Sequence, residues 1–572
     1  MARRAARSQP RPEVVHEPQR PAPVAIASAA DRWAARGPLL AALLALAAYA
    51  PSLGGGFLYD DIHVVVDNRR IRDLGAMGTV LRYEPARPVL NLTWALNYAA
   101  GGLAPWTYHL VNVAIHAGNA ALVASLFLWM ARRSPRRETP GAALFAAGLF
   151  AVTPMAAETV AYVSSRSTAL AALFGLGSLR LATRVLTQPS ARHVAGALFL
   201  FALALGTKEE AAAIPLLLLL LDYFFVAGQR VAEMRRRLTV HAAFLALPLV
   251  GLVARRAATG AWLPAPAADR GLYLLTQVAA YPVYLLRWLL PFDPAFFREH
   301  PLAGWPPSAV TLAWIALFAA IAVSAVAWRR RWPEWSFAVA WMGAALLPSS
   351  SIVPLAEMVV DHRAYLGGAG LLFWLGGVLW RRGGASLAVI VLTVLAARAW
   401  HYEWVLGDPV RAWEDATRRE PASADAHRAL ADAYAGRGDP RAMVALTTAV
   451  RLEPRDARSW ANLGVLYAQS GRLEDAATSM RAAAAAAPGD ARIHDNLGLI
   501  LQARGQDDEA AAAYEAAAAA NARLAQPRIR LAALLARRGQ AERARALLDE
   551  AAKLEIDAED ARAIEALRAQ LR

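Results

Sequence analysis

The chain has 572 residues, of which 57% are hydrophobic and only 19% are charged, and its mean hydropathy is +0.29. This composition is too apolar for one soluble domain and indicates a membrane domain joined to a soluble one. The formal net charge of +15 comes from short basic clusters between apolar stretches, which is typical of a topology signal and excludes a nucleic-acid footprint. The lack of cysteine excludes a disulfide framework and a thiolate metal site.

The first 36 residues carry seven arginines and several prolines. This composition predicts a disordered basic arm, and no cleavable signal pattern is visible in it. We expect residues 1–36 to lie in the cytoplasm, ahead of the first membrane helix.

Twelve apolar stretches within residues 37–402 predict a polytopic, all-helical membrane domain. They lie near 38–51, 108–131, 141–154, 161–179, 193–206, 211–226, 238–254, 271–290, 308–328, 335–348, 365–380 and 385–400.

Basic loops follow every second stretch, as alternation across a membrane requires, except that three stretches separate 229–237 from 328–332. The stretch 271–290 is interrupted by polar residues and a proline, so we expect it to lie in, or re-enter, the outer interface. About eleven spans then remain, with the N-terminus inside. The outer segments are a first loop at 52–107, then 155–160, 207–210 and 349–364, together with the C-terminal region.

From residue 406 to 572 the chain predicts a tetratricopeptide-repeat solenoid of about four repeats, with a partial one at 408–421. Gly438, Gly471, Gly505 and Gly539 lie 33, 34 and 34 residues apart, and the stretch WANLGVLYAQSGRLEDA at 460–476 matches the repeat pattern. Helical pairs at this period stack into a superhelix whose concave face usually holds a peptide or protein.

Ionisable residues gather in the four segments expected on the outer face, and charges at membrane depth indicate a functional site. These residues are Asp60, Asp61, Arg87, His109, Glu158, Arg166, Lys208, Glu209, Asp361, His362 and Arg363. No Walker loop or dinucleotide fingerprint is present, so no nucleotide site is expected. Cations at an outer interface suit the phosphate of a lipid-linked substrate, and a nearby carboxylate could take a proton from an incoming hydroxyl. This combination of carboxylates and cations therefore favours sugar transfer from a polyprenyl-phosphate carrier.

The order of six motifs, followed by the repeats, resembles the transmembrane and tetratricopeptide-repeat (TMTC-like) O-mannosyltransferases of the GT-C glycosyltransferase superfamily. The motifs are FLYDD (57–61), RPVLNLTWALNY (87–98), YHLVNVAIH (108–116), ETVAYVSSRS (158–167), KEE (208–210) and AEMVVDHRAYL (356–366). The chain departs from the family at Thr153-Pro154, where relatives often carry His-Pro.

The resemblance implies an inverting transferase that moves a sugar, typically mannose, from a polyprenyl-phosphate donor to Ser/Thr hydroxyls of acceptor proteins. Asp60 and Asp61 become the catalytic pair, and Lys208, Arg166 and Arg363 become ligands of the donor phosphate. Arg87, Glu158, Glu209, His362 and His109 are supporting candidates.

Two adjacent side chains of an extended segment cannot both face one pocket, which favours Asp60 over Asp61 as the base. His109 and His116 lie seven residues apart on one helix face and are expected to hydrogen-bond in the core. Two adjacent carboxylates do not supply three or four convergent ligands, so no metal site is expected. The lipid-linked sugar is then the cosubstrate and no other cofactor is expected.

Three alternatives stay open. The membrane half could merely anchor a repeat scaffold, the chain could transport a lipid-linked sugar, or the acceptor could be a glycolipid or cell-wall glycan. The expected location is the inner membrane, with a cytoplasmic N-terminus and periplasmic repeats.

Overall fold

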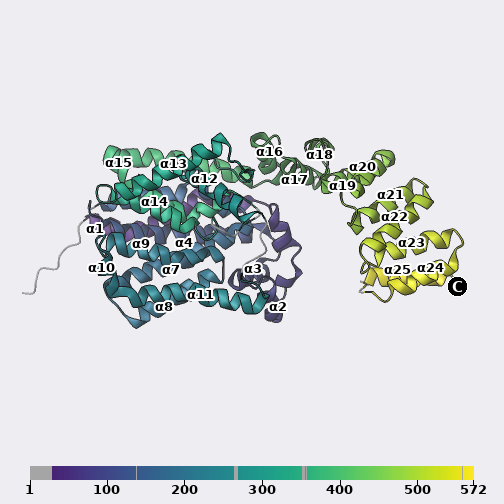
Figure 1. Ribbon diagram of the computed structural model, residues 1–572, viewed down its shortest axis with the longest axis horizontal. Helices are drawn as coiled ribbons and strands as arrows, with labels where there is room; N and C mark the ends of the chain where they lie inside the picture. The colour runs from purple at the N-terminus through teal and green to yellow at the C-terminus, as the bar shows by residue number, and fades with distance from the viewer. Residues whose placement is uncertain are drawn as a thin grey trace, which may run out of the picture.

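The computed structural model describes residues 29–136, 138–262, 268–350, 354–355, 357–554, 556 and 558–572, and this part of the chain contains helices and no strand. The helices up to residue 406 form one bundle, from which the remaining helices extend as a curved arm (Figure 1). The predicted all-helical fold class is confirmed. Most of the predicted basic arm lies outside the described residues. Its last part, from Ala29 onward, is helical because helix α1 starts there.

Each of the twelve predicted apolar stretches coincides with a helix of the bundle. The long helices are α1 (Ala29–Tyr49), α4 (Pro105–Ala131), α5 (Pro140–Val152), α7 (Arg166–Thr187), α8 (Ala191–Leu205), α9 (Ile214–Phe225), α11 (Leu238–Thr259), α12 (Arg270–Leu289), α13 (Ala309–Ala327), α14 (Pro333–Leu346) and α15 (Tyr365–Leu406). The last two stretches are the two halves of α15, which bends at Gly384, where φ is 55° and ψ is −145°.

Six of these helices are long and apolar enough to cross a membrane, or seven if α5 and the bent helix that follows it count as one span, within the described ranges. The predicted number of eleven spans is therefore not established by length and composition. Helices such as α9, with 12 residues, and α14, with 14, are shorter than the ~20 residues that a straight span needs.

Loops that alternate along the chain meet at opposite ends of the bundle. At the end predicted to be inside, Ser134 donates to Glu334 over 2.5 Å, and Gln229 donates to the Arg329 carbonyl over 3.0 Å. At the other end, segments 52–107, 155–165, 207–210 and 357–364 contact one another through the side chains described below. The grouping of loops thus follows the predicted alternation.

Both ends of α12 contact the segment between α14 and α15. The Tyr273 hydroxyl donates to the Ser349 carbonyl over 2.6 Å, and Arg287 Nη1 lies 2.6 Å from Asp361 Oδ1. Because Ser349 follows the end of α14 and Asp361 precedes α15, the two ends of α12 lie at the same end of the bundle. This placement is what we expect of a segment that does not cross.

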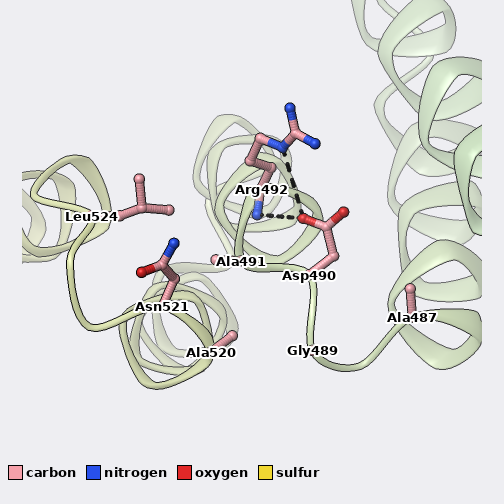
Figure 2. A pocket seen from close by; sticks show the side chains of 8 residues that line it. All are labelled: Ala487, Gly489, Asp490, Ala491, Arg492, Ala520, Asn521 and Leu524. Atoms are coloured by element: carbon pink, nitrogen blue, oxygen red, sulfur yellow. Dashed lines mark hydrogen bonds and ion pairs between the residues drawn. The ribbon is translucent and has the colours of Figure 1, made fainter. Parts of the chain in front are cut away.

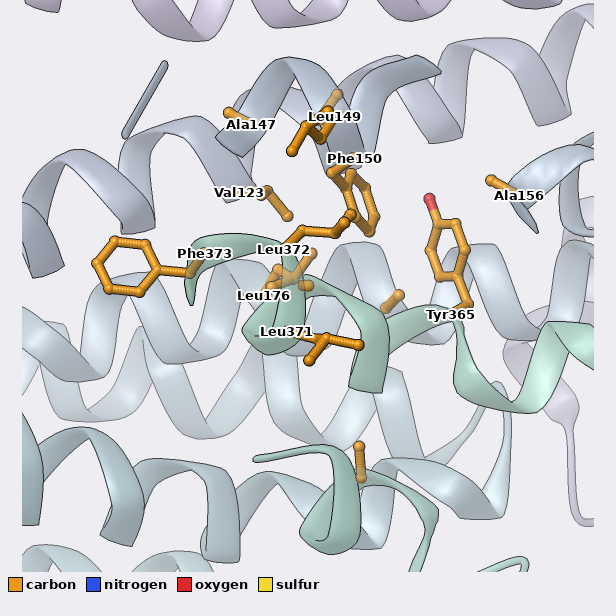
Figure 3. Packing of buried hydrophobic residues seen from close by; sticks show 14 of the residues in the cluster. Val123, Ala147, Leu149, Phe150, Ala156, Leu176, Tyr365, Leu371, Leu372 and Phe373 are labelled. Carbon is orange, nitrogen blue, oxygen red and sulfur yellow. The ribbon is translucent and has the colours of Figure 1, made fainter. Parts of the chain in front are cut away.

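The core of the bundle lies between α4, α5, α7 and α15, where Phe150, Leu176, Tyr365 and Leu372 are buried together (Figure 3). Small residues let α5 and α15 approach closely: a Cβ on Gly376 would come within 2.5 Å of the Ala146 Cβ. Such small-residue contacts are the usual means of packing helices in a membrane, where burial of apolar surface gives little drive.

The arm consists of four helical pairs with a helix on either side. The preceding helix is α16 (Pro409–Arg419), the pairs are α17 (Ala424–Ala435) with α18 (Arg441–Leu452), α19 (Ala457–Gln469) with α20 (Leu473–Ala486), α21 (Ala491–Ala503) with α22 (Asp507–Ala520), and α23 (Gln526–Arg537) with α24 (Ala541–Ala551), and α25 (Ala558–Gln570) ends the arm. The four periodic glycines all have φ between 67° and 75° in the turn within a pair. This left-handed conformation explains their regular spacing, because glycine adopts it without steric cost.

Shorter elements connect the helices at the outer end of the bundle. They include 62–66, α2 (Met77–Arg82) and α3 (Pro88–Gly101) in the first loop, α6 (Ala157–Ala161), and the 3-10 turns Glu209–Ala213 and Asp361–Ala364. Helices α2 and α3 lie at the end of the bundle that faces the arm (Figure 1).

Candidate functional site

The two adjacent aspartates of the first loop have opposite environments. Asp61 is fully buried, and its carboxylate accepts hydrogen bonds from the backbone N–H groups of Leu58, Val163 and Ser164 and from the Ser164 hydroxyl, at 2.7–3.3 Å. The Asp60 side chain is exposed. Asp61 therefore fastens the loop to the start of α7, whereas Asp60 remains free to meet a substrate.

Burial is the main cause of the shift in the pKa of Asp61. Loss of solvent raises the pKa of its carboxyl to about 7, although the four hydrogen bonds act in the opposite direction. The neighbouring Tyr162 hydroxyl accepts the Asp60 backbone N–H over 3.0 Å, and burial together with the Asp61 and Asp60 carboxylates raises the Tyr162 pKa. Tyr162 thus stays protonated and holds the loop from the membrane side.

A second polar group joins α6 to the start of α15. His362 Nδ1 lies 2.7 Å from Glu158 Oε1, and the His362 backbone N–H donates to the other carboxylate oxygen of Glu158 over 3.2 Å. Asp361 is ion-paired with Arg287 of α12. Arg363, 7% exposed, donates to the carbonyls of Glu357 and Met358. These pairs bring three segments far apart in sequence to one place.

Lys208 lies beside this group at the start of the turn Glu209–Ala213. Its Nζ donates to the Thr168 hydroxyl over 2.8 Å and is paired with Glu210 at 3.1 Å. A small cavity adjoins these contacts, lined by Thr168, Ala171, Ala172, Glu210, Ala211, Ile214, Ala345, Arg363 and Leu366. Arg363 lines this cavity, and Lys208 contacts two of the residues that line it, Thr168 and Glu210.

Glu209 pairs with Arg87 of the first loop and not with Lys208. Arg87 Nε and Nη2 donate to its two carboxylate oxygens at 3.2 and 3.0 Å. Burial opposes the effect, but the Arg87 guanidinium lowers the pKa of Glu209 to about 2. This bidentate pair ties the first loop to the turn that carries Lys208.

Arg166, which was predicted to bind the donor phosphate, lies in the interior of the bundle. Arg166 is fully buried; it donates to Asn112 Oδ1 and Asn97 Oδ1, both at 2.8 Å, and to the Tyr108 carbonyl at 3.0 Å. Its guanidinium clamps α3, α4 and α7 together, because a buried cation must be satisfied by such acceptors. Its remaining nitrogen, Nη1, is buried and has no hydrogen-bond partner among the described residues.

The two histidines of α4 hydrogen-bond in the interior, as their spacing predicts. His109 Nε2 lies 3.3 Å from the Gly56 carbonyl and supports the first loop, and His116 Nδ1 lies 2.6 Å from the Tyr365 hydroxyl. Among the residues that the structure describes, no group of three or more His, Asp and Glu side chains could hold a metal ion.

Sequence reasoning assigned no role to four residues that the structure places at the site, namely Tyr162, Ser164, Glu210 and Arg287. Tyr162 and Ser164 stand within the motif ETVAYVSSRS and Glu210 within KEE, so the motifs contained them without indicating their roles. The sequence could have indicated the role of Arg287, because a charged side chain inside an apolar stretch needs a partner.

The arm carries a separate hollow on the connections between its pairs. It is lined by Ala487, Gly489, Asp490, Ala491, Arg492, Ala520, Asn521 and Leu524. In Figure 2, Asp490 Oδ1 accepts the backbone N–H of Arg492 over 2.9 Å, and Arg492 Nε lies 3.9 Å from the same oxygen. The hollow lies between α20 and α23 of the arm and contains none of the predicted site residues.

A tetratricopeptide-repeat family model matches residues 440–499. Mouse protein O-mannosyl-transferase TMTC2 is 37% identical over 155 residues, which cover 25% of this chain and 18% of the relative. Human protein O-mannosyl-transferase TMTC4 is 30% identical over 200 residues, covering 30% of this chain and 27% of the relative. The chain resembles the TMTC proteins. The resemblance predicted from the motifs is thereby confirmed, although the matches span less than a third of the length of either relative.

Similarity to solved structures concerns part of the chain. The crystal structure of MamA covers 28% of this chain and 89% of its own, with 20% identity and a TM-score of 0.25. The crystal structure of YrrB, described as a TPR protein, covers 28% of this chain and 84% of its own, with 17% identity and the same TM-score.

Proposed function

We propose that the chain is a membrane glycosyltransferase that moves a sugar, mannose, from a polyprenyl-phosphate donor to Ser/Thr hydroxyls of acceptor proteins. The names of the TMTC relatives support the activity. The observation that carries the proposal is the gathering, at one end of an apolar bundle, of an exposed Asp60, of Arg363, which lines a small cavity, and of Lys208, which contacts residues of that lining.

In this reaction, Asp60 takes the proton of the acceptor hydroxyl, and the hydroxyl oxygen attacks the anomeric carbon of the sugar. The bond from that carbon to the phosphate oxygen breaks, and its electron pair leaves with the polyprenyl phosphate. Attack from the face opposite the phosphate inverts the anomeric configuration. The lipid-linked sugar is the cosubstrate, and no other cofactor is proposed.

Lys208 and Arg363 are proposed to stabilise the leaving phosphate as negative charge develops on it. In the free protein, Glu210 neutralises Lys208 and Glu357 lies 3.9 Å from Arg363. A bound phosphate would compete with these carboxylates for the same cations. Asp61, Tyr162 and the Arg87–Glu209 pair hold the surrounding loops and do not touch the substrate.

The repeats are proposed to bind the acceptor protein, since solenoids of this kind present an extended concave surface. We further propose that the site and the repeats face the periplasm and that residue 29 and the basic loops face the cytoplasm of the inner membrane. This orientation follows the distribution of arginine among the loops.

The direct test is to incubate the purified full chain with polyprenyl-phosphate mannose and a periplasmic protein fraction. Mass spectrometry should find one added hexose on Ser or Thr, and NMR of the glycopeptide should show the anomeric configuration opposite to that of the donor. Asp60→Asn keeps the shape and removes the base, and should reduce transfer by about 10²–10⁴-fold. Undiminished transfer by Asp60→Asn would refute the role of Asp60, and hexose found only on lipid or glycan would refute the protein acceptor.

A further inference from the structure

The first helix of the arm packs directly on the loop that carries Asp60. Trp413 of α16 is 3% exposed, and its ring lies 5.5 Å from the ring of Tyr59 in an edge-to-face contact. The same indole contacts Phe296 and Phe297 at 5.3 and 5.4 Å. The junction is reinforced on its rim, where Arg419 pairs with Asp293. The arm and the bundle therefore meet through a packed aromatic cluster next to the proposed base.

Tyr59 has a backbone conformation that its side chain does not favour. Its φ is +42°, in the left-handed region that bulky residues rarely adopt, and such a conformation costs about 1–3 kcal/mol unless the surroundings impose it. The bundle holds the residues after it, through the Tyr162 hydroxyl on the Asp60 N–H and through the four bonds to Asp61. On the side of the arm, the Tyr59 ring is held by its contact with Trp413.

We propose that the first repeat helix positions the proposed base: Trp413 packs on Tyr59, keeps this residue in its left-handed conformation and so presents Asp60 to the acceptor hydroxyl. The inference rests on the proposed role of Asp60. It makes Tyr59 and Trp413 positioning residues, and it makes the arm a structural part of the transfer site in addition to a binding surface.

A positioning role and an acceptor-binding role have different kinetic consequences. If Trp413 only helped to bind a protein acceptor, its loss would raise KM for that acceptor and leave kcat for a short peptide unchanged. If it positions Asp60, its loss lowers kcat for the short peptide as well, because a displacement of about 1 Å can cost ~10²-fold in rate.

The test compares four single variants of the full chain with a short Ser/Thr peptide as acceptor. Trp413→Ala and Tyr59→Ala should each lower kcat by about 10- to 100-fold, and the double variant should be no worse than either, since both remove one contact. Trp413→Phe keeps an aromatic ring and should retain most of the rate. Trp328→Ala is the matched control, because Trp328 is 51% exposed at the end of α13 and makes no contact with α16 among the described residues.

A measurement that does not depend on sugar transfer distinguishes a failure of this inference from a failure of the proposed function. Hydrogen exchange followed by mass spectrometry should show faster exchange of the amides of residues 57–62 in Trp413→Ala and Tyr59→Ala, and no change in Trp328→Ala. If the wild type transfers no sugar, the proposed function fails, and the exchange result alone decides whether Trp413 orders the loop that carries Asp60. Equal exchange in the Trp413→Ala and Trp328→Ala variants, or a rise in KM without a fall in kcat, would overturn the inference.

Discussion

Asp60 and Asp61 are adjacent in the sequence, but their side chains have different environments and different proposed roles. Both belong to the same motif, but the chain turns at Tyr59, so the first carboxylate faces solvent and the second enters the space between the first loop and α7. There the second carboxylate meets backbone N–H groups that lie 102 and 103 residues further along. Sequence reasoning could favour Asp60 because neighbours point apart, but the burial of Asp61 needed the position of residues 163–164.

The raised pKa of Asp61 predicts a stability that depends on pH. A carboxyl whose pKa is 3.8 unfolded and about 7 folded binds its proton more tightly in the folded state. Its contribution to stability is full below about pH 4 and is lost as the pH rises to 7, with a slope of at most ~1.4 kcal/mol per pH unit. The difference in unfolding free energy between the wild type and Asp61→Asn should therefore shrink from pH 5 to pH 7 and stay constant above pH 8.

Thermal or denaturant unfolding of the purified protein at several pH values measures this difference. Asp67→Asn is the control in the same loop, because the Asp67 side chain is 63% exposed. A difference between wild type and Asp61→Asn that is flat from pH 5 to pH 8 would show that Asp61 is ionised throughout.

Lys208 offers a test of the proposed phosphate contact. Lys208→Ala should lower kcat/KM for the lipid-linked donor by about 10²-fold, because it removes a cation from the position where charge develops. It should also reduce stability by about 1–3 kcal/mol, since Glu210 and Thr168 lose their partner.

The chain contains its own control for this change. Lys553, its one other lysine, is exposed on the arm far along the sequence, and Lys553→Ala should leave both quantities unchanged. Equal kcat/KM for Lys208→Ala and Lys553→Ala would remove Lys208 from the phosphate site.

At the scale of the elements, local signals predicted the helices well. Hydrophobic stretches became helices at each of the twelve positions, and the repeat period placed its glycines in left-handed turns. The two stretches at 365–380 and 385–400 were predicted as separate helices, and they form the two halves of α15, which meet at Gly384. A continuous helix would carry the chain straight on, so the conformation of one glycine decides the course of everything that follows.

Replacing Gly384 by alanine should destabilise the protein by about 1–3 kcal/mol. Its φ of 55° with ψ of −145° is a combination that residues with a Cβ rarely adopt, although a Cβ there would meet no atom within 4 Å. Gly251→Ala is the matched control, because Gly251 lies in α11 with equal space around its Cβ and helical backbone. That change should stabilise the helix by about 0.5–1 kcal/mol. The melting temperatures of the two purified variants compare them directly, and a Gly384→Ala variant as stable as Gly251→Ala would contradict the argument.

At the scale of the whole molecule, the outer segments converge as the sequence predicts. Arg87 meets Glu209, Asp61 meets Ser164, and Glu158 meets His362, each joining two of the four segments. The arm is attached to this same end through Trp413. The proposed transfer site and the repeats proposed to bind the acceptor are therefore adjacent, and one orientation in the membrane must serve both.

The cysteine-free sequence permits a clean test of that orientation. Single cysteines at His63 in the first loop, Ser470 in the arm and Gln188 between α7 and α8 would all be exposed. A membrane-impermeant maleimide should label His63→Cys and Ser470→Cys in intact spheroplasts, and Gln188→Cys only after permeabilisation. Labelling of Ser470→Cys and Gln188→Cys from the same side would contradict the proposed topology.

The sequence by itself determined the helices, the repeat solenoid and the end of the bundle at which charges gather, because hydrophobic periodicity, repeat spacing and basic loops are properties of local stretches. Only the tertiary structure decided which of those charges are available. Arg166 was expected to meet a ligand and is enclosed by Asn97, Asn112 and Tyr108, and Lys208 is already paired with Glu210. The burial and pairing of a charged side chain depend on segments tens to hundreds of residues away, and these meet only when the bundle packs.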